Sequence, residues 1–162
     1  APALFDRIES NIELEYDEKG INKGRKLKEL CDKDALKDID AAISVVSSAG
    51  NVGIIGYYWG GYLSWRMACQ SNNLSASVCY YGGDIPRLKT LEPKCSVLTH
   101  FGELDQGIPI DSVEVFKSIK PDVLTYTYPA DHGFNCDHRK QYNEVSAKVA
   151  LDRTLKFLKS YL

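Results

Sequence analysis

The sequence predicts an α/β fold in which a parallel sheet of about four strands is flanked by helices. Runs rich in Val, Ile, Tyr and Thr, typical of buried strands, recur at 51–56, 76–82, 96–102 and 123–129. Helical patterns lie between these runs, and this alternation is typical of parallel β-α units covered on both faces. The chain has 162 residues, of which 44% are hydrophobic, and contains no linker or repeat. A single domain over residues 1–162 is therefore expected.

The region before the first strand contains one predicted helix. Residues 1–30 are polar and irregular, and Gly20 and Gly24 interrupt any periodicity, so a loop with a short helix is expected there. Residues 34–48 are predicted to be helical, since the apolar positions Leu36, Ile39, Ile43 and Val46 follow helical spacing. Gly50 ends this element.

Three further helices are predicted between and after the strands. The first, over residues 61–71, carries Leu63 and Met67 on one face. The second, over 111–119, opens with Asp111 and Glu114 at the spacing of a capping box. The last covers about 138–160, and its predicted buried stripe consists of Val145, Val149, Leu151, Leu155 and Leu158.

Composition excludes several classes of partner. The net charge of −2 gives no reason to expect nucleic acid or an anionic membrane surface as a partner. No apolar run approaches the roughly 18 residues that a membrane span needs. Charged residues near the N-terminus interrupt any signal peptide, and the five scattered cysteines form no C-x-x-C pair. Reduced thiols in a cytoplasmic protein are therefore expected.

The segment Gly56-Tyr57-Tyr58-Trp59-Gly60 has the spacing of a nucleophile elbow, G-x-Nu-x-G. It follows a strand-like run and precedes a helical pattern, which is the context that this motif requires. The flanking glycines are expected to be necessary because side chains there would clash. Ser or Cys usually occupies the central position, where Tyr58 stands here.

Two other predicted strands end in polar turns. Asp105 follows the third strand and His132 follows the fourth, and the carboxyl ends of parallel strands meet at one edge of the sheet. The order nucleophile, acid, histidine is that of a hydrolase triad, in which His132 would be the general base and Asp105 would orient it. Glu103 is the alternative acid, although Asp105 is preferred.

Other kinds of site have weaker support. A metal site could be built from His132, Cys136 and His138, but a second cluster with ligand spacing is missing. The glycines form neither dinucleotide-binding nor P-loop motifs. Neither a cofactor nor a metal is therefore expected.

Several segments together resemble one family. They are Gly56-Tyr57-Tyr58-Trp59-Gly60-Gly61, Tyr80-Tyr81-Gly82, His100-Phe101-Gly102 with Asp105, His132-Gly133-Phe134 before the terminal helix, and Ala1-Pro2-Ala3-Leu4-Phe5-Asp6-Arg7. In these the chain is similar to the dienelactone hydrolases (carboxymethylenebutenolidases) of the α/β-hydrolase superfamily, whose elbow reads G-Y-C-x-G-G. The resemblance runs along nearly the whole chain.

The resemblance implies a hydrolase that acts on small-molecule esters or lactones through a nucleophile, His132 and Asp105. The Trp59 N–H would serve the oxyanion hole, and Arg7 matches an arginine that holds the substrate carboxylate, although it could also be an ordinary surface arginine. A second arginine of the family, four residues after the histidine, is replaced by Cys136. Tyr58 stands where the family has Cys. Ionising a free phenol at pH 7 costs about 4 kcal/mol, against about 2 kcal/mol for a thiol, so Tyr58 is expected to be a poor nucleophile that fills the pocket.

The resemblance also implies a truncated α/β-hydrolase fold. Such domains run about 200–250 residues, and the strands before residue 1 would be missing, together with a loop that supplies one of two oxyanion donors. The strand at 51–56 would then have a bare edge. Self-association through that edge or through the exposed faces, or pairing with a separate N-terminal piece, is expected.

Two functional hypotheses follow from these residues. The first is a dienelactone-hydrolase-type enzyme whose chemistry Tyr58 weakens or alters. The second is a non-catalytic relative that acts as a binding or assembly module.

Overall fold

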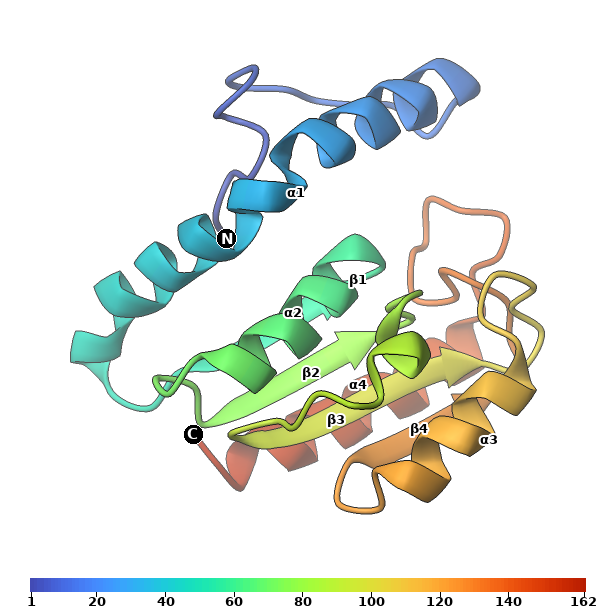
Figure 1. Cartoon of the computed structure of the whole chain (residues 1–162). Coiled ribbons are helices and arrows are strands. Elements are labelled where there is room, and N and C mark those ends of the chain that lie inside the picture. Colours follow the sequence, from blue (N-terminus) through green and yellow to red (C-terminus); the bar gives the residue numbers. More distant parts are fainter.

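The computed structural model describes residues 1–162 and contains one four-stranded parallel sheet in the order β1-β2-β3-β4 (Figure 1). The strands are β1 Gly53–Tyr57, β2 Ala76–Tyr80, β3 Ser96–Gly102 and β4 Leu124–Tyr128. Each strand pairs with the next one along the chain, so all four carboxyl ends meet at the same edge of the sheet. The predicted α/β class and the four strands are confirmed.

Helices cover both faces of this sheet (Figure 1). They are α1 Glu18–Val46, α2 Trp59–Gln70, α3 Ile110–Ile119 and α4 Glu144–Lys159, with short 3-10 turns at η1 Ser47–Ala49 and η2 Ile85–Leu88. The helices α2 and α3 share one face, where Trp65 packs edge-on against Phe116 at 5.3 Å between ring centroids. The helix α4 covers the other face, and α1 lies outside α2.

Two apolar clusters stabilise this arrangement. The larger contains 20 buried residues of the sheet, α2, α3 and α4, with Phe101 and Phe134 fully enclosed. The smaller contains seven buried residues and joins α1 to α2 and to the start of β1 through side chains such as Ile39, Leu63 and Val52. The second cluster positions α1 beside the elbow helix.

The helix α1 corrects the prediction for residues 1–30. It begins at Glu18, and the Asp17 side chain accepts a hydrogen bond of 2.7 Å from the Gly20 N–H as an N-cap. Its buried residues Leu27, Cys31, Ala35, Ile39 and Ile43 recur every four positions. A side chain at position 20 would lie 2.1 Å from the Glu15 carbonyl oxygen, so Gly20 permits close packing and does not interrupt the helix.

Two expectations about the other helices are wrong in detail. The helix α3 begins at Ile110 after Pro109, with no side-chain cap, so Asp111 lies in the first turn and forms no capping box. The helix α4 buries Ser146, Ala147, Ala150, Thr154 and Phe157, whereas Val145, Val149, Leu151 and Leu155 are exposed. Apart from Phe157, the buried residues of α4 are small, and most of its other large apolar side chains lie outside this contact.

A polar network joins the sheet to α4. The buried His100 ring lies 2.7 Å from the Tyr128 hydroxyl and 3.0 Å from the Thr154 hydroxyl, which in turn lies 2.7 Å from the Tyr80 hydroxyl. These side chains satisfy one another, as buried polar groups require.

All five cysteines are free thiols. None of the helices combines the length and the apolar composition that a membrane span needs.

Candidate active site

The junction of β1 and α2 forms a sharp turn centred on Tyr58. This residue has φ 52° and ψ −113°, a region that non-glycine residues rarely adopt and that costs about 1–3 kcal/mol. Gly56 makes the turn possible, since a Cβ there would lie 2.0 Å from the Gly60 carbonyl oxygen. A Cβ at Gly60 would meet no atom within 4 Å, so the expectation that both flanking glycines avoid clashes is wrong for Gly60.

The structure brings Asp105 and His132 together from the ends of β3 and β4. The His132 Nδ1 lies 2.6 Å from Asp105 Oδ2. The other carboxylate oxygen accepts hydrogen bonds from the Gly107 N–H at 2.8 Å and the Ile108 N–H at 3.1 Å. Asp105 is therefore held on both oxygens and fixes the orientation of the imidazole, which leaves His132 Nε2 available for chemistry.

The charge of Asp105 follows from its surroundings. Burial by itself raises the pKa of Asp105, but the hydrogen bond and charge of His132 and the two backbone N–H groups outweigh burial. The pKa of Asp105 therefore lies below its ordinary value, and the carboxylate is ionised at neutral pH. An ionised carboxylate at Nδ1 stabilises an imidazolium on the neighbouring ring.

Tyr58 lies against His132 but is not hydrogen-bonded to it. The two rings meet edge to face, with 5.2 Å between centroids and 89° between planes. On its other side, Lys28 Nζ of α1 lies 5.4 Å from the centroid of the Tyr58 ring. The phenol ring therefore occupies the space beside the imidazole, and its hydroxyl has no partner there.

The backbone N–H and the side chain of Trp59 have different surroundings. Its N–H belongs to the first residue of α2, where backbone N–H groups have no acceptor within the helix. Its indole Nε1 donates to Asp32 of α1 at 2.9 Å, and its ring stacks on Phe5 at 5.9 Å between centroids. The side chain thereby fastens α1 and the N-terminal segment to the elbow.

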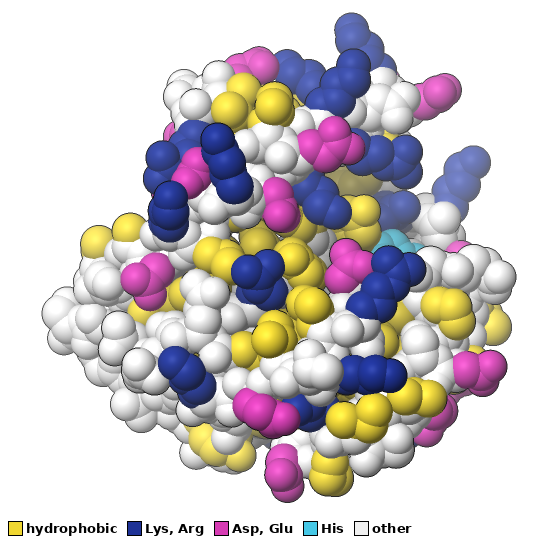
Figure 2. Space-filling model, in the orientation of Figure 1, with side chains coloured by type: hydrophobic (Ala, Val, Ile, Leu, Met, Phe, Trp, Pro, Cys, Tyr) yellow, Lys and Arg dark blue, Asp and Glu magenta, His cyan; other side chains and the backbone are white.

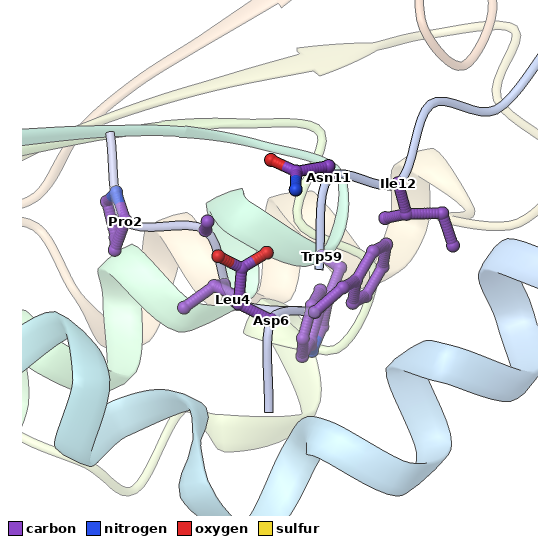
Figure 3. A pocket seen from close by; sticks show the side chains of 8 residues that line it. Pro2, Leu4, Asp6, Asn11, Ile12 and Trp59 are labelled. Carbon is purple, nitrogen blue, oxygen red and sulfur yellow. The ribbon is translucent and has the colours of Figure 1, made fainter. Parts of the chain in front are cut away.

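A pocket of about 390 Å³ lies beside Trp59 (Figure 3). It is lined by Pro2, Ala3, Leu4, Phe5, Asp6, Asn11, Ile12 and Trp59. Neither Tyr58, Asp105 nor His132 lines it, so this pocket adjoins Tyr58 through Trp59 and is not the space between these three side chains.

Arg7 lies apart from these groups, in an ion pair with α1. Its guanidinium binds both carboxylate oxygens of Asp38, with Nε at 2.7 Å and Nη2 at 2.5 Å. This bidentate pair occupies the donors that a substrate carboxylate would need. In this arrangement Arg7 fastens the N-terminal segment to α1.

The alternative residues have other partners. The Glu103 carboxylate accepts a hydrogen bond of 2.9 Å from the Thr127 hydroxyl at the surface, so Asp105 and not Glu103 contacts His132. His138 stacks on Tyr16, and the Cys136 thiol lies 3.4 Å from the Tyr16 hydroxyl. No group of three His, Cys, Asp or Glu side chains is close enough to hold a metal ion.

Three residues near the site, Arg139, Tyr81 and Lys28, were not among the predicted site residues. Gly133 has φ 78°, and a Cβ there would lie 3.0 Å from Arg139 Nη1, so the Arg139 guanidinium lies against the residue that follows His132. Tyr81, with φ 36°, places its ring centroid 5.3 Å from that of His132. Lys28 reaches Tyr58 from α1. Tyr81 directly follows β2, so its place at this edge of the sheet carries a local signal. Arg139 and Lys28 reach the site through the packing of a loop and of α1, which sequence spacing does not encode.

The surface is hollowed between α1 and the body of the molecule (Figure 2). Lys and Arg side chains gather along this hollow, which has hydrophobic side chains on its floor and a histidine at its edge. Neither Lys28 nor Arg139 forms an ion pair, although eight other Lys and Arg side chains do. Unpaired cations at a hollow attract anionic ligands.

Comparisons with known proteins show the family to which the chain is similar. The sequence matches the dienelactone hydrolase family over residues 1–162. It is 29% identical over 183 residues to a Synechocystis sp. protein whose name places it among the carboxymethylenebutenolidases, covering all of this chain and 74% of that protein. It is 29% identical to the carboxymethylenebutenolidase of Pseudomonas putida, covering 97% of this chain and 71% of that protein.

Other matches cover a smaller share of the matched protein's length. The chain is 30% identical to a relative from Escherichia coli K12, of which it spans 55%. A crystal structure from Klebsiella pneumoniae named for dienelactone hydrolase has a TM-score of 0.69 and 31% identity, covering 80% of this chain and 62% of that one. A Pyrococcus furiosus esterase, 15% identical with a TM-score of 0.61 over 79% of this chain and 62% of that one, shares the fold alone. The chain thus spans about half to three quarters of the relatives that it matches.

Proposed function

The chain belongs to the dienelactone hydrolase family, and we propose that it hydrolyses ester or lactone carbonyls of small molecules at the carboxyl end of its sheet. The observation that carries this proposal is the 2.6 Å contact between His132 Nδ1 and Asp105 Oδ2, formed beside a strained elbow residue. This contact is the base-and-orienting pair that acyl transfer requires.

The proposed reaction assigns a role to each residue. The group at position 58 attacks the carbonyl carbon while His132 Nε2 takes its proton, and Asp105 stabilises the imidazolium. The carbonyl oxygen becomes an oxyanion near the Trp59 N–H. His132 then returns the proton to the leaving alkoxide, which departs as an alcohol. Water finally hydrolyses the acyl group, with His132 taking its proton, and position 58 is restored.

Tyr58 limits this chemistry. A free phenol is harder to ionise than a thiol, and the ring lies edge to face with His132 without a hydrogen bond between them. Transfer of the phenolic proton to His132 would require the ring to move. The proposed activity of the natural chain is therefore slow.

The arrangement of Tyr58 and His132 without a hydrogen bond between them also favours a second candidate. This candidate is a relative without catalysis that binds a ligand in the hollow. The two candidates differ in whether any hydrolysis depends on His132. We expect slow hydrolysis of 4-nitrophenyl acetate by the natural chain, lowered at least about tenfold to the buffer rate by His132→Ala, since the general base is removed. His138→Ala, at an exposed histidine, is the control. A rate that His132→Ala leaves unchanged would favour the second candidate.

We further propose that the substrate carries a carboxylate and that Arg139 binds it. Arg139 lies against Gly133 beside His132 and forms no ion pair. Lys28 of α1 brings a second unpaired cation to Tyr58, with its Nζ 5.4 Å from the ring centroid. A guanidinium binds a carboxylate through two parallel hydrogen bonds, which suits a ligand whose charge lies beside its ester bond.

The Arg139→Gln change tests this assignment. We expect it to lower kcat/KM for mono-4-nitrophenyl succinate about tenfold, since a charged hydrogen bond is lost. The kcat/KM for the neutral 4-nitrophenyl butyrate should stay within about twofold. The faster Tyr58→Cys chain is the suitable background, and Lys140→Gln, at an exposed neighbouring cation, is the control. An equal effect on both esters would show that Arg139 has a structural role only.

A further inference from the structure

A second cavity lies at the end of the sheet opposite to Tyr58, Asp105 and His132. It has a volume of about 470 Å³ and lies between residues 92–97 and 119–123, the segments that lead into β3 and β4. These segments adjoin the amino ends of the strands, whereas the candidate active site lies at the carboxyl ends, to which the arrows of Figure 1 point. Small-molecule sites typically have volumes of about 300–1,000 Å³. The cavity is therefore large enough for a ligand and separate from the site of the proposed hydrolysis.

Lys120 lines this cavity and is buried. Its side chain is only 6% exposed, although lysine is rarely buried unless it is paired. Its partner is Glu92, whose carboxylate accepts a hydrogen bond from Lys120 Nζ while the Glu92 side chain stays 80% exposed. An ammonium group has three donors, and the chain provides that of Lys120 with this one acceptor. The buried cation therefore retains donors for a further partner in the cavity.

The two members of this ion pair are held differently. Lys120 is the C-cap residue of α3, and burial holds its side chain in place. Glu92 lies on the loop before β3, and its exposed side chain can turn into water at little cost to itself. Turning away would leave the Lys120 ammonium buried without an anion, which is strongly unfavourable. An anion that enters the cavity removes this penalty, so a ligand carboxylate can replace that of Glu92.

The other polar groups of the cavity determine which anion fits. Lys94 Nζ donates to the Gln70 carbonyl oxygen at 2.9 Å and forms no ion pair, and the half-buried Ser96 hydroxyl has no hydrogen-bond partner. Asp122 is the remaining acidic residue of the lining. Once Glu92 has turned away, two ammonium groups and one carboxylate remain, and a ligand with a single negative charge balances them. A phosphate dianion would bring an excess negative charge to a lining that already contains Asp122.

We propose that this cavity binds a small-molecule monocarboxylate, which takes the place of Glu92 on the Lys120 ammonium. The body of the ligand lies against Val97 and Val123, which are buried at the cavity, and a hydroxyl group on it bonds to Ser96. Because the ligand competes with Glu92, its apparent affinity is reduced to the fraction of molecules in which the ion pair is open. This inference is independent of the proposed hydrolysis.

Titration of the full chain with 3-hydroxybutyrate, followed by amide NMR, tests the proposal. We expect saturable shifts of the amides in segments 92–97 and 119–123. Glu92→Gln should tighten binding at least about tenfold, because an ion pair that is open less than about a tenth of the time lowers the apparent affinity by that fraction. Lys120→Met should abolish binding, since the cation is lost. This variant should fold, because a buried apolar side chain replaces a buried charge and the exposed Glu92 needs no partner.

The matched controls come from an exposed ion pair on the same helix. Glu114→Gln and Lys117→Met each remove one member of that pair and should leave the affinity within about twofold. The neutral 3-hydroxybutyramide should not bind, and phosphate should bind more weakly than 3-hydroxybutyrate. If Lys120 and Glu92 form only a structural ion pair, these segments will not shift, or Glu92→Gln will leave binding unchanged or weaker, and either result would overturn the proposal. Shifts confined to residues around His132, or tighter binding of phosphate, would also refute it.

Discussion

Replacing Tyr58 by Cys is expected to raise the rate of 4-nitrophenyl acetate hydrolysis by about 10²–10³-fold. The easier ionisation of a thiol lowers the barrier by about 2 kcal/mol, which corresponds to about thirtyfold in rate. The rest of the rate gain comes from removing the phenol ring, whose centroid lies 5.2 Å from that of His132, because the substrate can then enter. The measurement is the initial rate with a nitrophenol burst, accompanied by the mass of the acyl-enzyme.

Two variants separate the causes of this gain. Tyr58→Ala opens the same space without a nucleophile and should not produce an acyl-enzyme. Tyr58→Cys combined with His132→Ala should lose most of the gain, because the thiol then lacks its base. A folded Tyr58→Cys chain that is no faster than the natural one would show that position 58 does not limit the reaction.

Acidification is expected to destabilise the fold through His100, by about 2–3 kcal/mol between pH 6.5 and 4.5. Burial, aided by the nearby Arg153, lowers the pKa of His100 to about 3. An unfolded histidine titrates near pH 6.5, so between these values the unfolded chain binds a proton that the folded chain does not. Stability is therefore complete above about pH 6.5 and declines as the pH falls toward 3.

Urea unfolding at several pH values measures this effect. The unfolding free energy of His100→Asn should be lower than that of the natural chain at pH 7, because contacts to Tyr128 and Thr154 are lost. Its further decline from pH 6.5 to 4.5 should be smaller by about 2–3 kcal/mol. His138→Asn, at an exposed histidine, is the control and should keep the natural slope. Equal slopes for His100→Asn and the natural chain would refute the assignment.

The strands, and the positions of Asp105 and His132 after two of them, could be predicted because their signals are local. Each strand is a short run of β-branched and aromatic residues, and Asp105 and His132 each follow one of these runs directly. Parallel pairing then brings both to one edge of the sheet. The contact between them depends on loop packing, which holds Asp105 on the Gly107 and Ile108 N–H groups, and no spacing rule specifies that.

The predictions that were wrong or missing also have physical causes, which lie in the packing of the chain. The first part of α1, residues 18–33, was missed because Gly20 and Gly24 lower helix propensity, whereas close packing against Glu15 favours glycine at position 20. The buried face of α4 was misjudged because hydrophobic periodicity does not reveal which face meets the sheet. The position of Arg139 beside Gly133 depends on the path of a loop, which sequence spacing does not encode.

The residue at the elbow also determines how the chain withstands oxidants. A reactive cysteine in that position would be open to peroxide and to thiol-directed inhibitors, which convert it to sulfenic acid or an adduct. Tyr58 offers neither reagent a sulfur atom. Burial raises the pKa of the Cys69 and Cys95 thiols to about 11 and that of Cys79 to about 12, so these sulfurs are poorly reactive as well. The turn at position 58 therefore offers an oxidant no thiol, whereas a cysteine there would be the stronger nucleophile.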